Sequence, residues 1–240
     1  MHYKLKKNLK NLLNGLIPEF MKFDITSKFS KNAKLSYAQE GEDILLPRII
    51  GDIGKAGFFI DIGAHHPQLF SNTYKLYQAG WRGINIDAMP GSMNSFKEVR
   101  SEDINLEVAI SNKKEDLKYY MFTHPEVNTF SEESAKLWEG HEFVKLIRTE
   151  TLKTDTIESI LEKNAPGKNK FDLLSVDAEG LDLSIISSFD FNKYSFRFII
   201  VEDKPDDVLT VMNGPLYQFL ISKNYKLISK LFYSCIYVPA

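Results

Sequence analysis

The sequence predicts an α/β fold built on a mostly parallel, doubly wound sheet with helices on both faces. Short apolar segments typical of buried strands alternate along the chain with segments typical of helices. The strand segments are continuously apolar, which indicates that both faces of the sheet are covered. A terminal hairpin, expected from residues 226–230 and 235–238, adds an antiparallel strand at the end of the sheet.

The remaining elements follow in order along the chain. A first helix is expected at 39–50 because Leu45, Leu46, Ile49 and Ile50 fall on one face. Apolar and β-branched runs predict strands at residues 57–61, 83–87, 105–110, 118–122, 171–177 and 196–202. Further helices are expected at residues 72–79, 92–99, 153–161 (opening at Thr154 or Asp155), 183–187 and 215–223. A loop rich in Thr and Ser is expected at 128–134.

Composition limits the class of protein. The 240 residues are 43% hydrophobic and 26% charged, as in ordinary globular domains, and no apolar run approaches the roughly 18 residues of a membrane span. Residues 1–23 show no signal peptide pattern. The single cysteine, Cys235, excludes a disulfide framework and a cysteine-based zinc site, so a reduced, cytoplasmic protein is expected.

Charge divides the chain into two parts. Residues 1–34 hold eight lysines and two acidic residues, whereas the other 206 residues carry a net charge of −8. We therefore expect a basic helical N-terminal extension at 1–35 and a single domain at 36–240. The extension either packs on the domain through its leucines or contacts an anionic partner or membrane surface. Because the domain is acidic, nucleic acid is not an expected partner.

Carboxylates follow four of the five strands expected in the parallel sheet. They are Asp61, Asp87, Asp177 and the pair Glu202 and Asp203. In an open α/β sheet, ligands bind at the carboxyl ends of the strands, so these side chains mark the expected site.

The turn after the first strand favours one cofactor over another. It contains only one glycine, Gly63, and a proline, Pro67, which has no N–H, so it does not match the glycine-rich turn that binds a dinucleotide pyrophosphate. A nicotinamide-dependent oxidoreductase is therefore a weaker alternative. Asp61 suits a cationic ligand without phosphate, such as S-adenosylmethionine. Gly63 would let the backbone approach it, and Asp87 would accept hydrogen bonds from its ribose hydroxyls.

The order and spacing of several motifs resemble the FkbM-type methyltransferases, a branch of the class I S-adenosylmethionine-dependent enzymes. The matching segments, within residues 36–203, are YAQEGED (37–43), GFFIDIGAHHP (57–67), SNTYKLY (71–77), GWRGINID (80–87), SVDAEGL (175–181) and FIIVE (198–202). The resemblance implies a seven-stranded Rossmann-like sheet, O-methylation, and acceptors such as sugars or other secondary metabolites, including surface-polysaccharide precursors. It implies cofactor contacts at Asp61, Gly63, Ala64, Asp87, Ala88, Ala109 and Asp177, although Ala88 stands where the family pattern has proline.

Methyl transfer requires a group that removes a proton from the acceptor. Asp177, Glu202 and Asp203 would repel one another unless a cation joins them, and Mg²⁺ or Ca²⁺ prefers such oxygen ligands. The alternative is that Asp177 or Glu179 is an N-cap or first-turn acid stabilised by the dipole of a helix, and that Glu202 pairs with Lys204 on the surface.

Histidines are the second source of a candidate base. His65 and His66 follow the cofactor turn and titrate near neutral pH, which makes them candidate catalytic residues, with His124 as a weaker candidate. Residues 128–131 could cover the substrate. The leading interpretation is thus a methyltransferase acting on a small polar acceptor, with a homodimer as its expected assembly. A cofactor-binding subunit without turnover is the non-enzymatic alternative.

Overall fold

The computed structural model describes residues 33–51, 56–205 and 207–240. Residues 36–240 group into one compact unit. The helical extension expected at 1–35 lies, but for its last three residues, outside the described residues, and with it the leucines expected to pack on the domain.

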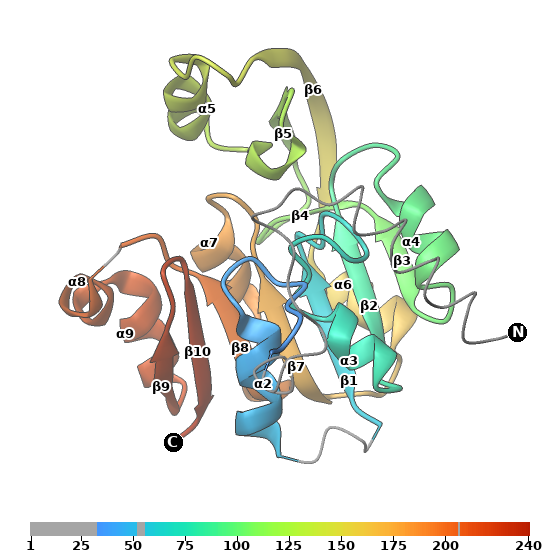
Figure 1. Ribbon diagram of the computed structural model, residues 1–240, viewed down its shortest axis with the longest axis vertical. Helices are drawn as coiled ribbons and strands as arrows, with labels where there is room; N and C mark the ends of the chain where they lie inside the picture. The colour runs from blue at the N-terminus through green and yellow to red at the C-terminus, as the bar shows by residue number, and fades with distance from the viewer. Residues whose placement is uncertain (1–32, 52–55, 206) are drawn as a thin grey trace, which may run out of the picture. The chain divides into compact units, whose positions relative to one another are not determined.

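A seven-stranded sheet forms the centre of the unit, in the order β3-β2-β1-β7-β8-β10-β9 (Figure 1). Neighbouring strands from β3 to β8 pair in parallel, and β10 pairs antiparallel with both β8 and β9. The predicted doubly wound sheet and its terminal antiparallel hairpin are confirmed. The strands are β1 (Phe58–Ile62), β2 (Arg82–Asp87), β3 (Ile104–Glu107), β7 (Lys170–Val176), β8 (Ser195–Glu202), β9 (Tyr225–Lys230) and β10 (Ser234–Pro239).

Successive side chains of the central strands enter two separate hydrophobic cores. In β1, Ile60 belongs to the core that includes residues of α6 (Ile157–Asn164), α7 (Asp182–Ser188) and α9 (Pro215–Ser222), whereas Phe59 belongs to the core that includes residues of α2 (Glu42–Ile50) and α3 (Tyr74–Gln78). This alternation is the pleat of a strand that is buried on both faces. It explains why these strands are continuously apolar in sequence.

Side-chain caps mark the first turns of α6 and α8 (Val208–Asn213). The side chain of Thr156 accepts a hydrogen bond from the amide of Ser159 at the start of α6, and that of Asp207 accepts one from the amide of Thr210 at the start of α8. Such caps satisfy amides that have no partner within the helix. The expectation that the helix opens at Thr154 or Asp155 is therefore wrong by one or two residues, because those residues end a strand. Helix α4 (Met93–Val99) lies between β2 and β3 in the chain.

A second sheet, in the order β4-β6-β5, was not expected from the sequence. The strand predicted at 105–110 is divided between β3 and β4 (Ala109–Ile110), which belongs to this second sheet. β5 (Asp116–Phe122) pairs antiparallel with β6 (Leu146–Asp155), and η3 (Pro125–Val127) and α5 (Glu132–Glu139) lie between them. Helix α5 occupies part of the predicted loop at 128–134. The second sheet, η3 and α5 together form what we call the second module. It lies beyond the carboxyl ends of the strands of the seven-stranded sheet (Figure 1).

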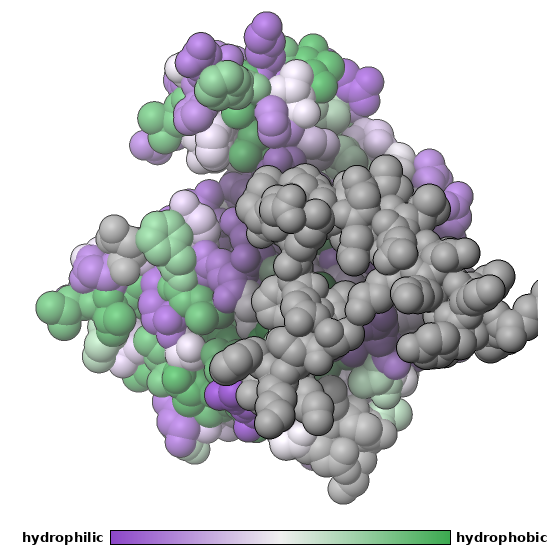
Figure 2. All heavy atoms as spheres, in the orientation of Figure 1, coloured by the Kyte–Doolittle hydropathy of each residue, from purple (hydrophilic) through white to green (hydrophobic). Residues whose placement is uncertain are grey.

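Within the part of the chain that the structure describes, no helix is long and apolar enough to cross a membrane. Exposed apolar side chains gather over α8, where Val208, Leu209 and Met212 reach solvent (Figure 2).

Candidate functional site

A cavity of about 490 Å³ opens at the carboxyl ends of β1, β2, β7 and β8. Its floor comes from the turns that follow these strands, and β5, η3 and α5 supply the opposite wall. Among the predicted site residues, six line it: Gly63, His65, Asp87, Ala88, Asp177 and Glu202. Asp61, Ala64, His66, Ala109 and Asp203 do not belong to this lining.

Gly63 fixes the turn after β1. Its φ is +77°, in the left-handed region, and a Cβ added there would overlap the carbonyl oxygen of Asp177. The amides of Gly63 and Ala64 both donate to the carbonyl of Ile86, at 2.9 and 3.0 Å. Only glycine combines this conformation with such close packing. The turn therefore presses directly against the end of β7, which places Asp177 beside it.

Asp87 ends β2 and accepts two backbone hydrogen bonds. Oδ2 accepts from the amide of His65 at 2.9 Å, and Oδ1 accepts from the amide of Met89 at 2.8 Å. Burial raises the pKa of this carboxyl group, and the two amides oppose the rise. The carboxylate thus ties the turns that follow β1 and β2 together at the cavity wall.

Apolar side chains continue this wall beyond Asp87. Ile86, Val108 and Ile110 line the cavity, whereas Ala109 is buried within β4 between two of them. Ala109, predicted as a cofactor contact, therefore does not line the cavity, whereas its neighbours Val108 and Ile110 do. Ala64 is buried against Met93 and Phe96 of α4.

Asp61 lies behind the cavity in a buried polar network. Its Oδ2 accepts a 2.6 Å hydrogen bond from the hydroxyl of Thr73, which accepts one of 3.0 Å from Nη1 of Arg100. Burial raises the pKa of Asp61, opposed by the Thr73 hydrogen bond and by the charge of Arg100. Its placement supports the floor of the site and does not put the carboxylate into the cavity.

The three predicted histidines are placed differently. His65 lines the cavity with φ +52°, and its amide holds Asp87. Nδ1 of His66 accepts hydrogen bonds from the amides of Gln68 and Leu69 at 3.1 and 2.9 Å. Burial and the charge of His65 lower the pKa of His66, which suits a ring nitrogen that accepts. His66 thus closes its own turn, and His124 is an exposed residue before η3.

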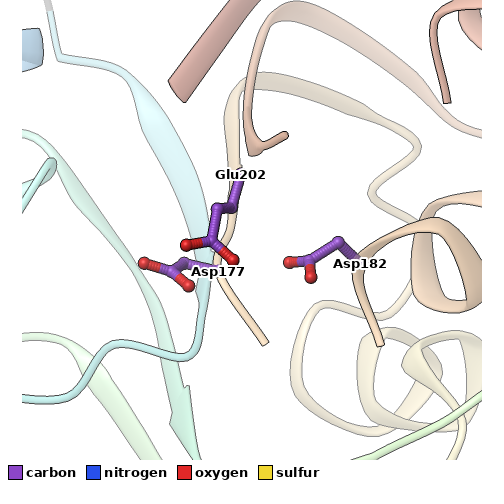
Figure 3. A group of neighbouring side chains, drawn as sticks. All are labelled: Asp177, Asp182 and Glu202. Carbon is purple, nitrogen blue, oxygen red and sulfur yellow. The ribbon is translucent and has the colours of Figure 1, made fainter. Parts of the chain in front are cut away.

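Three carboxylates converge at the ends of β7 and β8 and the start of α7. One oxygen from each of Asp177, Asp182 and Glu202 lies within 4.8 Å of the others (Figure 3). Oδ1 of Asp177 is buried and has no hydrogen-bond partner. Burial, and then the charge of Glu202, raises the pKa of Asp177 well above its usual range. Burial, together with the charges of Glu179 and Asp182, raises the pKa of Glu202 to about 8.

The predicted metal-ligand set is therefore changed at one position. Asp203 is outside the group: its amide donates to the carbonyl of Tyr233, and its carbonyl accepts from Nζ of Lys230. Consecutive residues at a strand end point to opposite sides, so Asp203 cannot accompany Glu202. Asp182 takes its place, and its carboxylate also accepts from the amides of Ala178 and Gly180 at 2.8 and 3.2 Å.

The cavity lining combines charged side chains with aromatic rings. Nζ of Lys204 lies 2.8 Å from Glu179 and 3.4 Å from Glu202. The aromatic side chains of Tyr119, Phe130 and Trp138 also line the cavity. The cavity thus offers apolar surface together with a set of hydrogen-bond acceptors. Tyr119 falls in the strand predicted at 118–122 and Phe130 in the segment predicted to cover the substrate, but Trp138 and the pairing of β5 with β6 were not predicted.

Comparison with known structures finds distant similarities. The chain is 10% identical to a protein provisionally described as an RNA methyltransferase from Pyrococcus horikoshii, with a TM-score of 0.42, and 84% of each chain is covered. It is 13% identical to a precorrin-6y C5,15-methyltransferase from Geobacter metallireducens (TM-score 0.41, 85% of this chain and 88% of that one). It is 12% identical to the N-terminal domain of human METTL16 in complex with SAH (TM-score 0.40, 82% and 66%).

Comparison with families is more decisive. No curated protein matches the sequence. The profile of the methyltransferase FkbM domain matches residues 61–227, more than half of the chain, and this range includes the turn after β1, the three-carboxylate group and Lys204. The chain therefore belongs to the FkbM methyltransferase family and is an S-adenosylmethionine-dependent methyltransferase.

Proposed function

We propose that the protein methylates a hydroxyl group of a small polar acceptor, and that the acceptor is a carbohydrate. The observation that supports this proposal is that Asp177, Glu179 and Glu202 line the same cavity as the aromatic side chains of Tyr119, Phe130 and Trp138. Carboxylates accept hydrogen bonds from sugar hydroxyls, and an aromatic ring packs on the apolar face of a sugar.

The cofactor would lie at the end of the cavity formed by β1 and β2. Bound S-adenosylmethionine supplies an electrophilic methyl group on a sulfonium. Asp87 would accept hydrogen bonds from the ribose hydroxyls, and Ile86, Val108 and Ile110 would pack against the adenine. Ala88 and the backbone at Gly63 complete this end. Asp61 would act from behind, by holding Thr73 and the turn after β1.

Asp177 and Glu202 are the proposed groups that take the proton from the acceptor hydroxyl. Their carboxylates lie side by side near the strand ends, so a hydroxyl placed between them could donate to either (Figure 3). His65, which also lines the cavity, is the second candidate base. In-line displacement also requires that this hydroxyl face the methyl group, which the aromatic wall would enforce.

We also propose that Asp177, Asp182 and Glu202 can hold a divalent cation such as Mg²⁺. The unpartnered Oδ1 of Asp177 and the mutual approach of the three carboxylates fit an ion with oxygen ligands. Because Lys204 already contacts Glu202, the ion would compete with that ammonium group. A Mg²⁺-dependent rise in Tm for the unmodified protein, absent in Asp177→Asn, would support the site. An equal rise in both would contradict it.

A screen of acceptors tests the proposed reaction. Full-length protein is incubated with S-adenosylmethionine carrying a labelled methyl group and with free hexoses, 6-deoxyhexoses, nucleotide-linked sugars and a short RNA. We expect label in a sugar and none in RNA. Transfer to RNA alone, or to amines alone, would overturn the proposal.

Cofactor binding is tested separately by calorimetry with S-adenosylhomocysteine, using NAD⁺ as the control ligand. Asp87→Asn replaces an acceptor oxygen by a donor and should weaken S-adenosylhomocysteine binding by about tenfold or more. The exposed Asp116→Asn is the matched control and should bind normally. Equal affinities for the two variants would remove Asp87 from the cofactor site.

The setting of the reaction extends these proposals. We propose that the acceptor is a precursor of a surface polysaccharide, that methylation takes place in the cytoplasm, and that the enzyme works as a homodimer. The single cysteine, buried Cys235, supports a reducing compartment. The molar mass in solution tests the homodimer directly.

A further inference from the structure

The turn between β7 and α7 has an unusual backbone. Glu179 has φ +46° and Gly180 has φ +104°, so two consecutive residues lie in the left-handed region. A non-glycine residue there costs free energy and persists only when its surroundings hold it. The carboxylate of Asp182, at the start of α7, accepts hydrogen bonds from the amides of Ala178 and Gly180 and so holds this turn.

Thr129 holds the same turn through its side chain. Its hydroxyl donates to the carbonyl of Glu179 at 2.6 Å and accepts from the amide of Ser131 at 3.0 Å. The side chain is fully buried. One hydroxyl thus joins the second module to the turn that carries the acidic residues.

The position of Thr129 itself does not depend on this hydroxyl. Its amide and carbonyl pair with the carbonyl and amide of Tyr120 at 3.1 and 2.9 Å, which anchors the residue beside β5. Removing the hydroxyl therefore leaves its backbone anchor in place. What is lost is the hydrogen bond from the hydroxyl to the carbonyl of Glu179.

Glu179 in turn places a charge at the acceptor end of the cavity. Its carboxylate binds Lys204 at 2.8 Å, and Lys204 contacts Glu202 at 3.4 Å. All three side chains line the cavity. A shift of the carbonyl of Glu179 would move its side chain and loosen the ammonium group beside Glu202.

We propose that Thr129 is a positioning residue that fixes Glu179, and through it Lys204 and Glu202, in the arrangement that receives the acceptor. This inference rests on the proposed function, because it assigns the acceptor to that end of the cavity. Thr129 acts through the backbone of Glu179 and does not itself line the cavity.

Three full-length variants test the role. Thr129→Val keeps the side-chain shape and removes the hydroxyl, whereas Thr129→Ser keeps the hydroxyl. Thr156→Val is the matched control, because it removes a half-buried hydroxyl that caps α6 and does not line the cavity. With the sugar that the unmodified enzyme methylates best, Thr129→Val should lower kcat about tenfold with the KM for S-adenosylmethionine unchanged. Thr129→Ser should stay within about twofold of the unmodified enzyme, and Thr156→Val should keep its kcat. An unchanged kcat in Thr129→Val, or an equal loss in Thr156→Val, would overturn the proposal.

Hydrogen exchange gives a readout that needs no acceptor. In the presence of S-adenosylhomocysteine, amides of residues 178–181 should exchange faster in Thr129→Val than in the unmodified protein, Thr129→Ser or Thr156→Val. Equal exchange in all four proteins would overturn the contact as a constraint on the turn. If no sugar is methylated, the proposed function fails, and the exchange result still decides the role of Thr129.

Discussion

At the scale of single residues, Gly63 shows how a turn can depend on a neighbour far along the chain. A glycine with a left-handed backbone is common in turns. At Gly63, however, the space that a Cβ would need is also taken by the carbonyl oxygen of Asp177. Any side chain at this position would push β1 and β7 apart where Asp177 enters the cavity.

Gly63→Ala should therefore destabilise the protein by more than about 3 kcal/mol, measured by urea unfolding. Gly167 provides the comparison, because it has nearly the same φ, +75°, with open space around its Cα. Gly167→Ala should cost about 1 kcal/mol, the cost of the left-handed conformation alone. Equal losses in the two variants would show that the packing against Asp177 does not matter.

The site residues differ in how far the sequence could predict them. Asp87, Asp177 and Glu202 end strands, and strand ends can be recognised from apolar runs. Asp182 was missed because it lies in the first turn of α7 and not at a strand end. It comes close to Asp177 only because the turn between β7 and α7 reverses the chain. Gly63 was expected to make room for a ligand, whereas the structure places a backbone carbonyl there.

At the scale of elements, a buried ion pair joins the end of α4 to β2. Nε of Arg100 lies 2.9 Å from Oδ2 of Asp103, and both side chains are fully buried. Asp103 also accepts from the amide of Gly83 and from the side chain of Asn85, both in β2. The pair thus fixes the loop that leads into β3.

Asp103→Asn should cost about 3 kcal/mol or more in the free energy of unfolding, because it removes the carboxylate that contacts the buried Arg100 guanidinium. The neighbouring pair of Arg82 and Glu102 is partly exposed. Glu102→Gln should therefore cost less than about 1 kcal/mol. Chemical denaturation of both variants checks the difference, and similar losses would contradict it.

Strands were predicted correctly where burial on both faces gives them a continuous apolar sequence. The strands of the main sheet are apolar on both faces and were recognised. β6 was missed because many of its side chains are exposed and polar, including Arg148, Thr149 and Lys153, so neither a continuous apolar run nor a clear alternation marks it. Its pairing with β5 supplies the order that the local sequence does not indicate.

At the scale of the whole molecule, the three-carboxylate group links stability to pH. The pKa of Glu202 is raised from 4.5 to about 8, and that of Asp177 is raised as well. The folded protein therefore binds more protons than the unfolded chain, so the stabilisation is complete at low pH and is lost as pH rises through the folded pKa. We expect the free energy of unfolding in the presence of a chelator to fall between about pH 5 and 8.

Glu202→Gln should flatten this decline and be more stable than the unmodified protein at about pH 8. The exposed Glu133→Gln is the control and should follow the unmodified protein. Urea unfolding across this pH range measures the effect. A decline of the same size in Glu202→Gln would show that other groups cause it.

The order of the strands has a consequence for synthesis of the chain. β10 is made after β9 but lies between β9 and β8, so β9 cannot join the sheet until β10 arrives. Until then, the apolar edge of β8 has no strand beside it, and such edges promote aggregation. During synthesis this half of the sheet therefore stays open until β10 has emerged from the ribosome.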